Sequence, residues 1–87
     1  MRTADLDSID RRVSHEFAVN KRLRLLIHRA TAMCRADRKR ISRGYDVARE
    51  CEAYAKHLRE TARPTPDTIL RSAYAERVAR DIRKALA

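Results

Sequence analysis

The chain has 87 residues, among them one Gly, two Pro and no Trp, and 38% of its residues are charged. This length fits one domain, so we expect residues 1–87 to form a single helical domain. One Gly leaves few of the tight turns that hairpins and phosphate-binding loops need. The composition therefore predicts an all-α protein.

Membrane spans, secretion and metal chemistry are not expected from this sequence. The longest strongly apolar stretch, residues 23–33, contains arginines and is well short of the roughly 20 apolar residues of a membrane span. The N-terminus lacks the cationic start and apolar block of a signal peptide, so we expect a cytoplasmic protein with no membrane partner.

Cys34 and Cys51 are expected to be free thiols, with a disulfide between them as a second possibility. Neither the cysteines nor the histidines show metal-ligand spacing, so we expect no metal and no other cofactor.

The first predicted element is one long helix over residues 4–42. Thr3 is its expected N-cap, and Gly44 is expected to end it because glycine adopts the left-handed conformation without steric strain. Apolar residues recur along this segment at intervals of three and four, which is the period of an amphipathic helix. This stripe comprises Leu6, Ile9, Val13, Phe17, Leu23, Ile27, Ala30 and Cys34.

Two shorter helices are predicted after Gly44. Asp46 is the expected N-cap of the second helix, whose inner face is rich in alanine. The segment Pro64-Thr65-Pro66-Asp67 interrupts the pattern, with Thr65 as the N-cap and Pro66 as the first residue of a third helix. The sequence therefore predicts a three-helix antiparallel arrangement with a long first helix.

The unequal lengths of these helices predict a homodimer. A helix over residues 4–42 would be about 58 Å long, and the other two about half that. The first half of its apolar stripe, Leu6, Ile9, Val13 and Phe17, would then lack cover. Either the chain bends near Asn20 and folds this segment back as a fourth helix, or a second subunit covers it. We favour the dimer because residues 19–21 contain neither Gly nor Pro.

The charge distribution favours a binding function. The formal net charge is +9, which attracts acidic partners such as nucleic acid. The densest basic cluster is expected to contact phosphates, although a simple solvated helix end has the same pattern. An alternative is an inhibitor or adaptor that grips an acidic protein surface through Leu6, Ile9, Val13 and Phe17. Local catalytic motifs are absent from the sequence, so we expect no enzyme. The basic cluster comprises Arg35, Arg38, Lys39, Arg40 and Arg43.

A third possibility rests on a resemblance to a known family. Leu6-Asp7-Ser8-Ile9-Asp10 resembles the opening of the helical chorismate mutases, and Tyr45-Asp46-x-x-Arg49-Glu50 is similar to the motif that begins their second helix. The resemblance implies an intertwined dimer of three-helix chains and formation of prephenate that depends on Arg29 and Arg49. The sequence departs from the family at two positions expected to bind substrate, which here hold Asn20 and Thr31.

Overall fold

The computed structural model describes residues 3–15, 21–36, 41–60 and 63–87, and these residues form four helices and no strand. The helices are α1 (Thr3–His15), α2 (Lys21–Ala36), α3 (Ile41–Arg59) and α4 (Pro66–Leu86). The predicted all-α class is confirmed. None of the four helices is both long enough and apolar enough to span a lipid bilayer.

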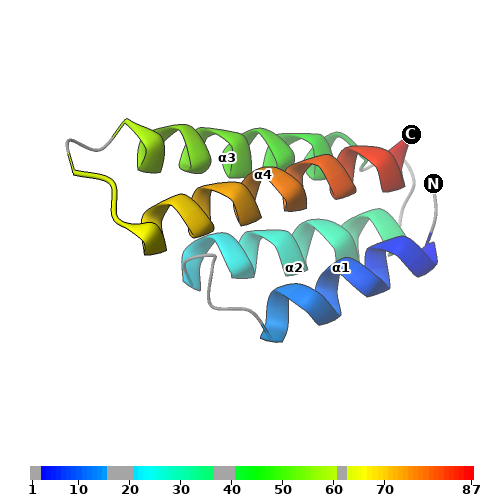
Figure 1. Cartoon of the computed structure of the whole chain (residues 1–87). Helices are drawn as coiled ribbons and strands as arrows, with labels where there is room; N and C mark the ends of the chain where they lie inside the picture. The colour runs from blue at the N-terminus through cyan, green and yellow to red at the C-terminus, as the bar shows by residue number, and fades with distance from the viewer. Residues whose placement is uncertain (1–2, 16–20, 37–40, 61–62) are drawn as a thin grey trace.

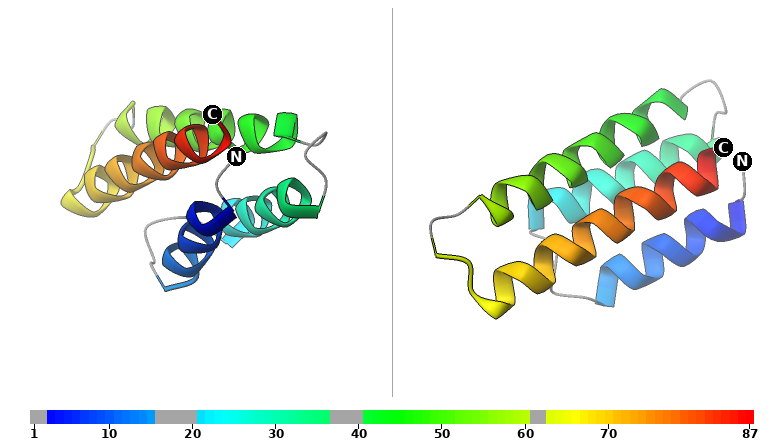
Figure 2. Two further views of the ribbon diagram at one scale, coloured as in Figure 1. Left: turned by 90° about the vertical axis from the view of Figure 1, so that its right-hand side faces the viewer. Right: turned by 45° about the horizontal axis from the view of Figure 1, so that its top comes forward.

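The helices form two layers, with α3 and α4 in one layer and α1 and α2 in the other (Figure 1). The largest interface joins α3 to α4, while α2 packs on α3 and α1 packs on both α2 and α4. Within the described residues α1 does not pack on α3, and α2 does not pack on α4. In the bundle α1 therefore lies diagonally across from α3, and α2 lies diagonally across from α4. The α2–α3 and α1–α4 seams therefore lie on opposite edges of the bundle, as the end-on view in Figure 2 shows.

The three-helix arrangement with a long first helix is wrong. The predicted helix over residues 4–42 is replaced by α1 and α2, and α1 lies against α2 of the same chain. Burying a large aliphatic side chain stabilises a fold by about 1.5–3 kcal/mol. Folding α1 back gains this energy within one chain, although residues 19–21 lack a Gly or Pro.

The apolar stripe of α1 is part of the core and is not an interface. Leu6, Ile9 and Val13 are 1%, 2% and 0% exposed, because α2 and α4 cover them. Their assignment as anchors for a dimer or a partner protein is therefore wrong. Phe17, the fourth predicted anchor, lies outside the described residues. The argument for a homodimer loses its basis, since it required this stripe to lack cover.

Gly44 lies inside α3 and does not end a helix. No described residue, this glycine included, has a positive φ. The glycine instead permits close packing, because a Cβ added at Gly44 would overlap Leu86 Cδ1 and lie 3.2 Å from Cys34 Sγ. The expected N-cap at Asp46 is also wrong, since α3 begins at Ile41.

The start of α4 follows the sequence prediction. Thr65 is the N-cap and accepts a hydrogen bond at Oγ1 from the Thr68 backbone N, 3.2 Å away. The Thr65 backbone N donates in return to Thr68 Oγ1 at 2.8 Å, which completes a capping box. Pro66 occupies the first turn, where its missing N–H leaves no bond unmade.

Both cysteines are free, as expected from the sequence, and both are buried. Burial raises the pKa of the Cys34 thiol, and burial together with the charges of Glu50 and Glu52 raises the pKa of Cys51 to about 12. The thiols therefore stay protonated at neutral pH and pack as small apolar groups in the core.

Candidate functional site

The charge on α2 differs from that on the other helices. Every residue of α2 that is charged at neutral pH is cationic, whereas α1, α3 and α4 carry both signs. Several cations of α3 and α4 pair with neighbouring acids, as in the ion pairs Arg71–Asp67 at 3.0 Å and Arg83–Glu52 at 2.7 Å. The cations of α2 are Lys21, Arg22, Arg24, Arg29 and Arg35.

A groove of about 400 Å³ separates α2 from α3. On α2 it is lined by residues 22, 26, 29, 30 and 33, which lie on one helix face. Residues 43, 46, 47 and 50 line it from α3. The groove therefore has an apolar floor that includes Leu26 and Met33, both half-buried, and an exposed arginine rim. We call Arg22, Arg29 and Arg43, the arginines of this rim, the arginine trio.

The cationic surface continues along α2 beyond the groove. Lys21 and Leu25 line an adjoining hollow together with Arg22, Leu26 and Arg29. Leu25 is 54% exposed, so this hollow presents an apolar side chain among its cations. The two hollows form a continuous surface in which long cationic side chains flank apolar ones.

The structure assigns only part of the predicted basic cluster to this surface. Arg43 is exposed in the first turn of α3 and belongs to the arginine trio. Arg35 lies in α2, but its side chain is not among those described. Arg38, Lys39 and Arg40 lie outside the described residues. Sequence reasoning missed Arg22 and Arg29 as partners of Arg43, although α2 shows a signal for them in its lack of acidic residues.

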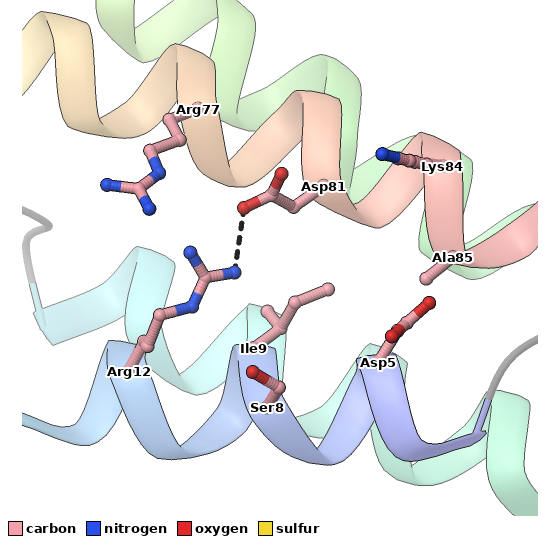
Figure 3. A pocket seen from close by; sticks show the side chains of 8 residues that line it. All are labelled: Asp5, Ser8, Ile9, Arg12, Arg77, Asp81, Lys84 and Ala85. Carbon is pink, nitrogen blue, oxygen red and sulfur yellow. Dashed lines mark hydrogen bonds and ion pairs between the residues drawn. The ribbon is translucent and has the colours of Figure 1, made fainter.

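The opposite edge of the bundle carries a polar pocket of about 310 Å³ between α1 and α4, shown in Figure 3. Arg12 Nη2 donates to Asp81 Oδ2 at 2.7 Å across it, and both side chains are about one-third exposed. The pocket therefore mixes three cations with two carboxylates. It is lined by Asp5, Ser8, Ile9 and Arg12 from α1 and by Arg77, Asp81, Lys84 and Ala85 from α4.

A polar cluster joins α1 to α2 and resembles a hydrolytic triad in its order of groups. Asp10 Oδ1 accepts from Thr31 Oγ1 at 2.6 Å and lies 3.1 Å from His28 Nδ1, while His28 Nε2 lies 3.3 Å from Ser14 Oγ. However, Ser14 Oγ also donates to the backbone carbonyl of Asp10 at 2.9 Å. Its proton is then directed away from the imidazole, and the serine is not activated. We interpret the cluster as a cross-link that holds α1 on α2.

Comparisons of the chain with protein-family models, curated proteins and solved structures found no match. The resemblance to helical chorismate mutases therefore stays a prediction, and the four helices differ from the three-helix chain that it implies. Arg29 lines the α2–α3 groove, whereas Arg49 is exposed and paired with Asp46. The described residues contain no group of three or more metal-ligating side chains.

Proposed function

We propose that this chain is a small basic binding protein that contacts the phosphate backbone of nucleic acid through the groove between α2 and α3. The observation that carries the proposal is the convergence of the arginine trio, from two helices, on one exposed groove. An arginine guanidinium presents a planar set of donors that matches phosphate oxygens.

The positive charge of the arginine trio is not neutralised by ion pairs. Among the described residues, no carboxylate forms an ion pair with Arg22, Arg29 or Arg43. The groove also contains two acids, but Asp46 is engaged by Arg49. Glu50 is then the acid left to offset the arginine trio. One negative charge against three positive charges leaves the groove positive, and phosphates can neutralise this charge.

Salt-dependent binding to a short duplex DNA tests this proposal. Each phosphate neutralised contributes about 0.9 to the slope of log affinity against log salt, so replacing the arginine trio by Gln should lower the slope by about 3. The matched control is Arg11→Gln with Arg63→Gln and Arg80→Gln, which removes the same charge from exposed positions outside the groove. The control should keep most of the affinity and slope.

Glu50→Gln provides a test in the opposite direction. Removing this negative charge from the groove should tighten DNA binding by about twofold to fivefold, the size of one partly screened charge interaction. The proposal fails if the full chain binds no DNA at low salt. It also fails if the control variant loses as much affinity as the variant without the arginine trio.

A second candidate is an inhibitor or adaptor that binds an acidic amphipathic helix of another protein in the same groove. The observation in its favour is the apolar component, with Leu25 more than half exposed and Leu26 and Met33 on the groove floor. Leu25→Gln distinguishes the two candidates. It should weaken binding of such a helix about tenfold, since apolar anchors dominate helix-in-groove recognition, while leaving DNA affinity unchanged.

We also propose that the protein acts in the cytoplasm. Two buried free thiols support this, because reducing compartments keep cysteines unpaired. Fractionation of cells that express the tagged chain tests the proposal, and recovery outside the cytoplasm would refute it.

A further inference from the structure

The pocket between α1 and α4 is built from facing positions of two antiparallel helices. The numbers of facing residues sum to about 89, which sets Asp5 opposite Lys84 and Ser8 opposite Asp81. The same register sets Arg12 opposite Arg77. One end of the pocket therefore has opposite charges, and the other end has two guanidinium groups, as Figure 3 shows.

Among the residues that the structure describes, the charge at the arginine end is only partly balanced. Asp81 accepts from Arg12 at 2.7 Å, and this ion pair accounts for one of the two guanidinium charges. No described residue forms a hydrogen bond or ion pair with Arg77, and its side chain is exposed. Two guanidinium groups that face one another, with one carboxylate beside Arg12, leave a position that favours a further anion.

Arg12 also has donor capacity that Asp81 does not use. Its Nε is buried and has no hydrogen-bond acceptor, which is unfavourable for a polar group removed from water. A small movement of this side chain, which is about one-third exposed, would let an incoming oxyanion accept hydrogen bonds from the Arg12 guanidinium and from Arg77 together. Planar guanidinium groups bind oxyanions of phosphate or carboxylate geometry through paired hydrogen bonds.

We infer that this pocket binds a small hydroxylated phosphate monoester, with its phosphoryl group between Arg12 and Arg77 and a hydroxyl group on Asp81. A phosphoryl group carries two negative charges and three terminal oxygens, so as a ligand group it matches two guanidinium groups better than a single carboxylate would. The volume of about 310 Å³ lies at the lower end of ligand pockets, so the ligand is small. The carboxylates of Asp5 and Asp81 accept from hydroxyl groups and disfavour a ligand with several phosphates.

The inference does not depend on the proposed nucleic-acid function, because the two sites lie on opposite edges of the bundle. Glycerol 3-phosphate is a suitable probe, added to the full chain at constant ionic strength while backbone amide NMR shifts are recorded. Saturable shifts around residues 8–12 and 77–84, with a dissociation constant of about 1 mM or below, are expected.

The decisive comparison uses two arginines of the same helix. Arg77→Gln should weaken glycerol 3-phosphate binding about tenfold, since it removes one of two charge-assisted contacts. Arg80→Gln removes the same charge from an exposed α4 position outside the pocket and should bind as the unmodified chain does. Equal weakening by both variants would overturn the inference, as would the absence of saturation at about 20 mM probe.

Further arms separate the two sites and the source of the phosphate. Arg77→Gln should leave duplex DNA affinity unchanged, and replacing the arginine trio should leave glycerol 3-phosphate binding unchanged. Inorganic phosphate should bind more weakly than the monoester, because it lacks the carbon-borne hydroxyl groups that Asp81 accepts from. If DNA displaces the probe from the pocket amides, the pocket binds nucleic-acid phosphates and the inference of a small ligand is wrong.

Discussion

Replacing Gly44 by Ala should destabilise the protein, although alanine is the better helix former. Gly44 lies inside α3, where the exchange alone would contribute about 0.5–1 kcal/mol of stability. The added methyl group would overlap Leu86 Cδ1, and overpacking a tight core costs about 1–3 kcal/mol. The expected net loss is about 1 kcal/mol, equivalent to a fall in Tm of about 4–8 °C for a chain of this size.

Shortening Leu86 should reverse the sign of the stability change caused by Gly44→Ala. Leu86→Ala alone should cost about 2 kcal/mol, because it removes a buried side chain near the chain end. It also removes the atom that the new methyl group would overlap. In that background Gly44→Ala should therefore stabilise the protein by up to about 1 kcal/mol, a coupling of about 2 kcal/mol between the two sites.

Urea unfolding followed by far-ultraviolet circular dichroism measures all four free energies in this double-mutant cycle. The remaining close neighbour, Cys34 Sγ at 3.2 Å, needs to shift by only a few tenths of an ångström in either background. The reasoning is refuted if Gly44→Ala stabilises both backgrounds equally. That result would mean that Leu86 moves aside without loss and that close approach does not require the glycine.

Three further predictions concern the thiols, the α1–α2 cross-link and the oligomeric state. The pKa of Cys51 is raised to about 12 from an ordinary 9.0, so between these two pH values the thiol ionises in the unfolded chain and stays protonated in the folded chain. The free energy of unfolding should fall by up to about 1.4 kcal/mol per pH unit above about pH 9, and urea titrations of Cys51→Ala should lack this share. Thr31→Val should lower the free energy of unfolding in urea by about 2 kcal/mol, because the 2% exposed Thr31 donates to the Asp10 carboxylate. A loss below about 0.5 kcal/mol would show that the cross-link between α1 and α2 contributes little. Sedimentation equilibrium should give the mass of one chain, 10.1 kDa, because the α1 stripe is covered internally, and a stable dimer would contradict this.

The predictions that held are those that depend on local chemistry. The start of α4 could be predicted because Thr65, Pro66 and Asp67 act on backbone groups within one turn. Cys34 and Cys51 were expected to be free thiols from their number and spacing, and both are free.

The predictions that failed are those where one pattern fits two arrangements. A stripe with period 3.6 from Leu6 to Cys34 fits one long helix or two helices that fold onto one another, and only packing decides between them. Gly44 likewise has two physical uses, positive φ and close approach, and the sequence cannot separate them. Its use here depends on Leu86, which lies far away along the chain.

The candidate sites could be predicted only in part for the same reason. Arg43 was assigned from the density of basic residues, but its partners Arg22 and Arg29 come from another helix. The α1–α4 pocket depends on an antiparallel register that no local pattern contains. The sequence does show that α2 lacks acidic residues, which predicts that the exposed surface of α2 binds negatively charged groups of another molecule.

The position of α1 gives the two edges of the bundle different behaviour in subglobal opening. This helix is the shortest of those described, and its interfaces with α2 and α4 are the smallest in the bundle, so α1 is expected to detach first while the α3–α4 pair persists. Detachment would dismantle the pocket that holds Arg12 and leave the α2–α3 groove intact. A ligand in the pocket would therefore slow hydrogen exchange at the α1 amides, and a higher ligand occupancy would make detachment of α1 less frequent.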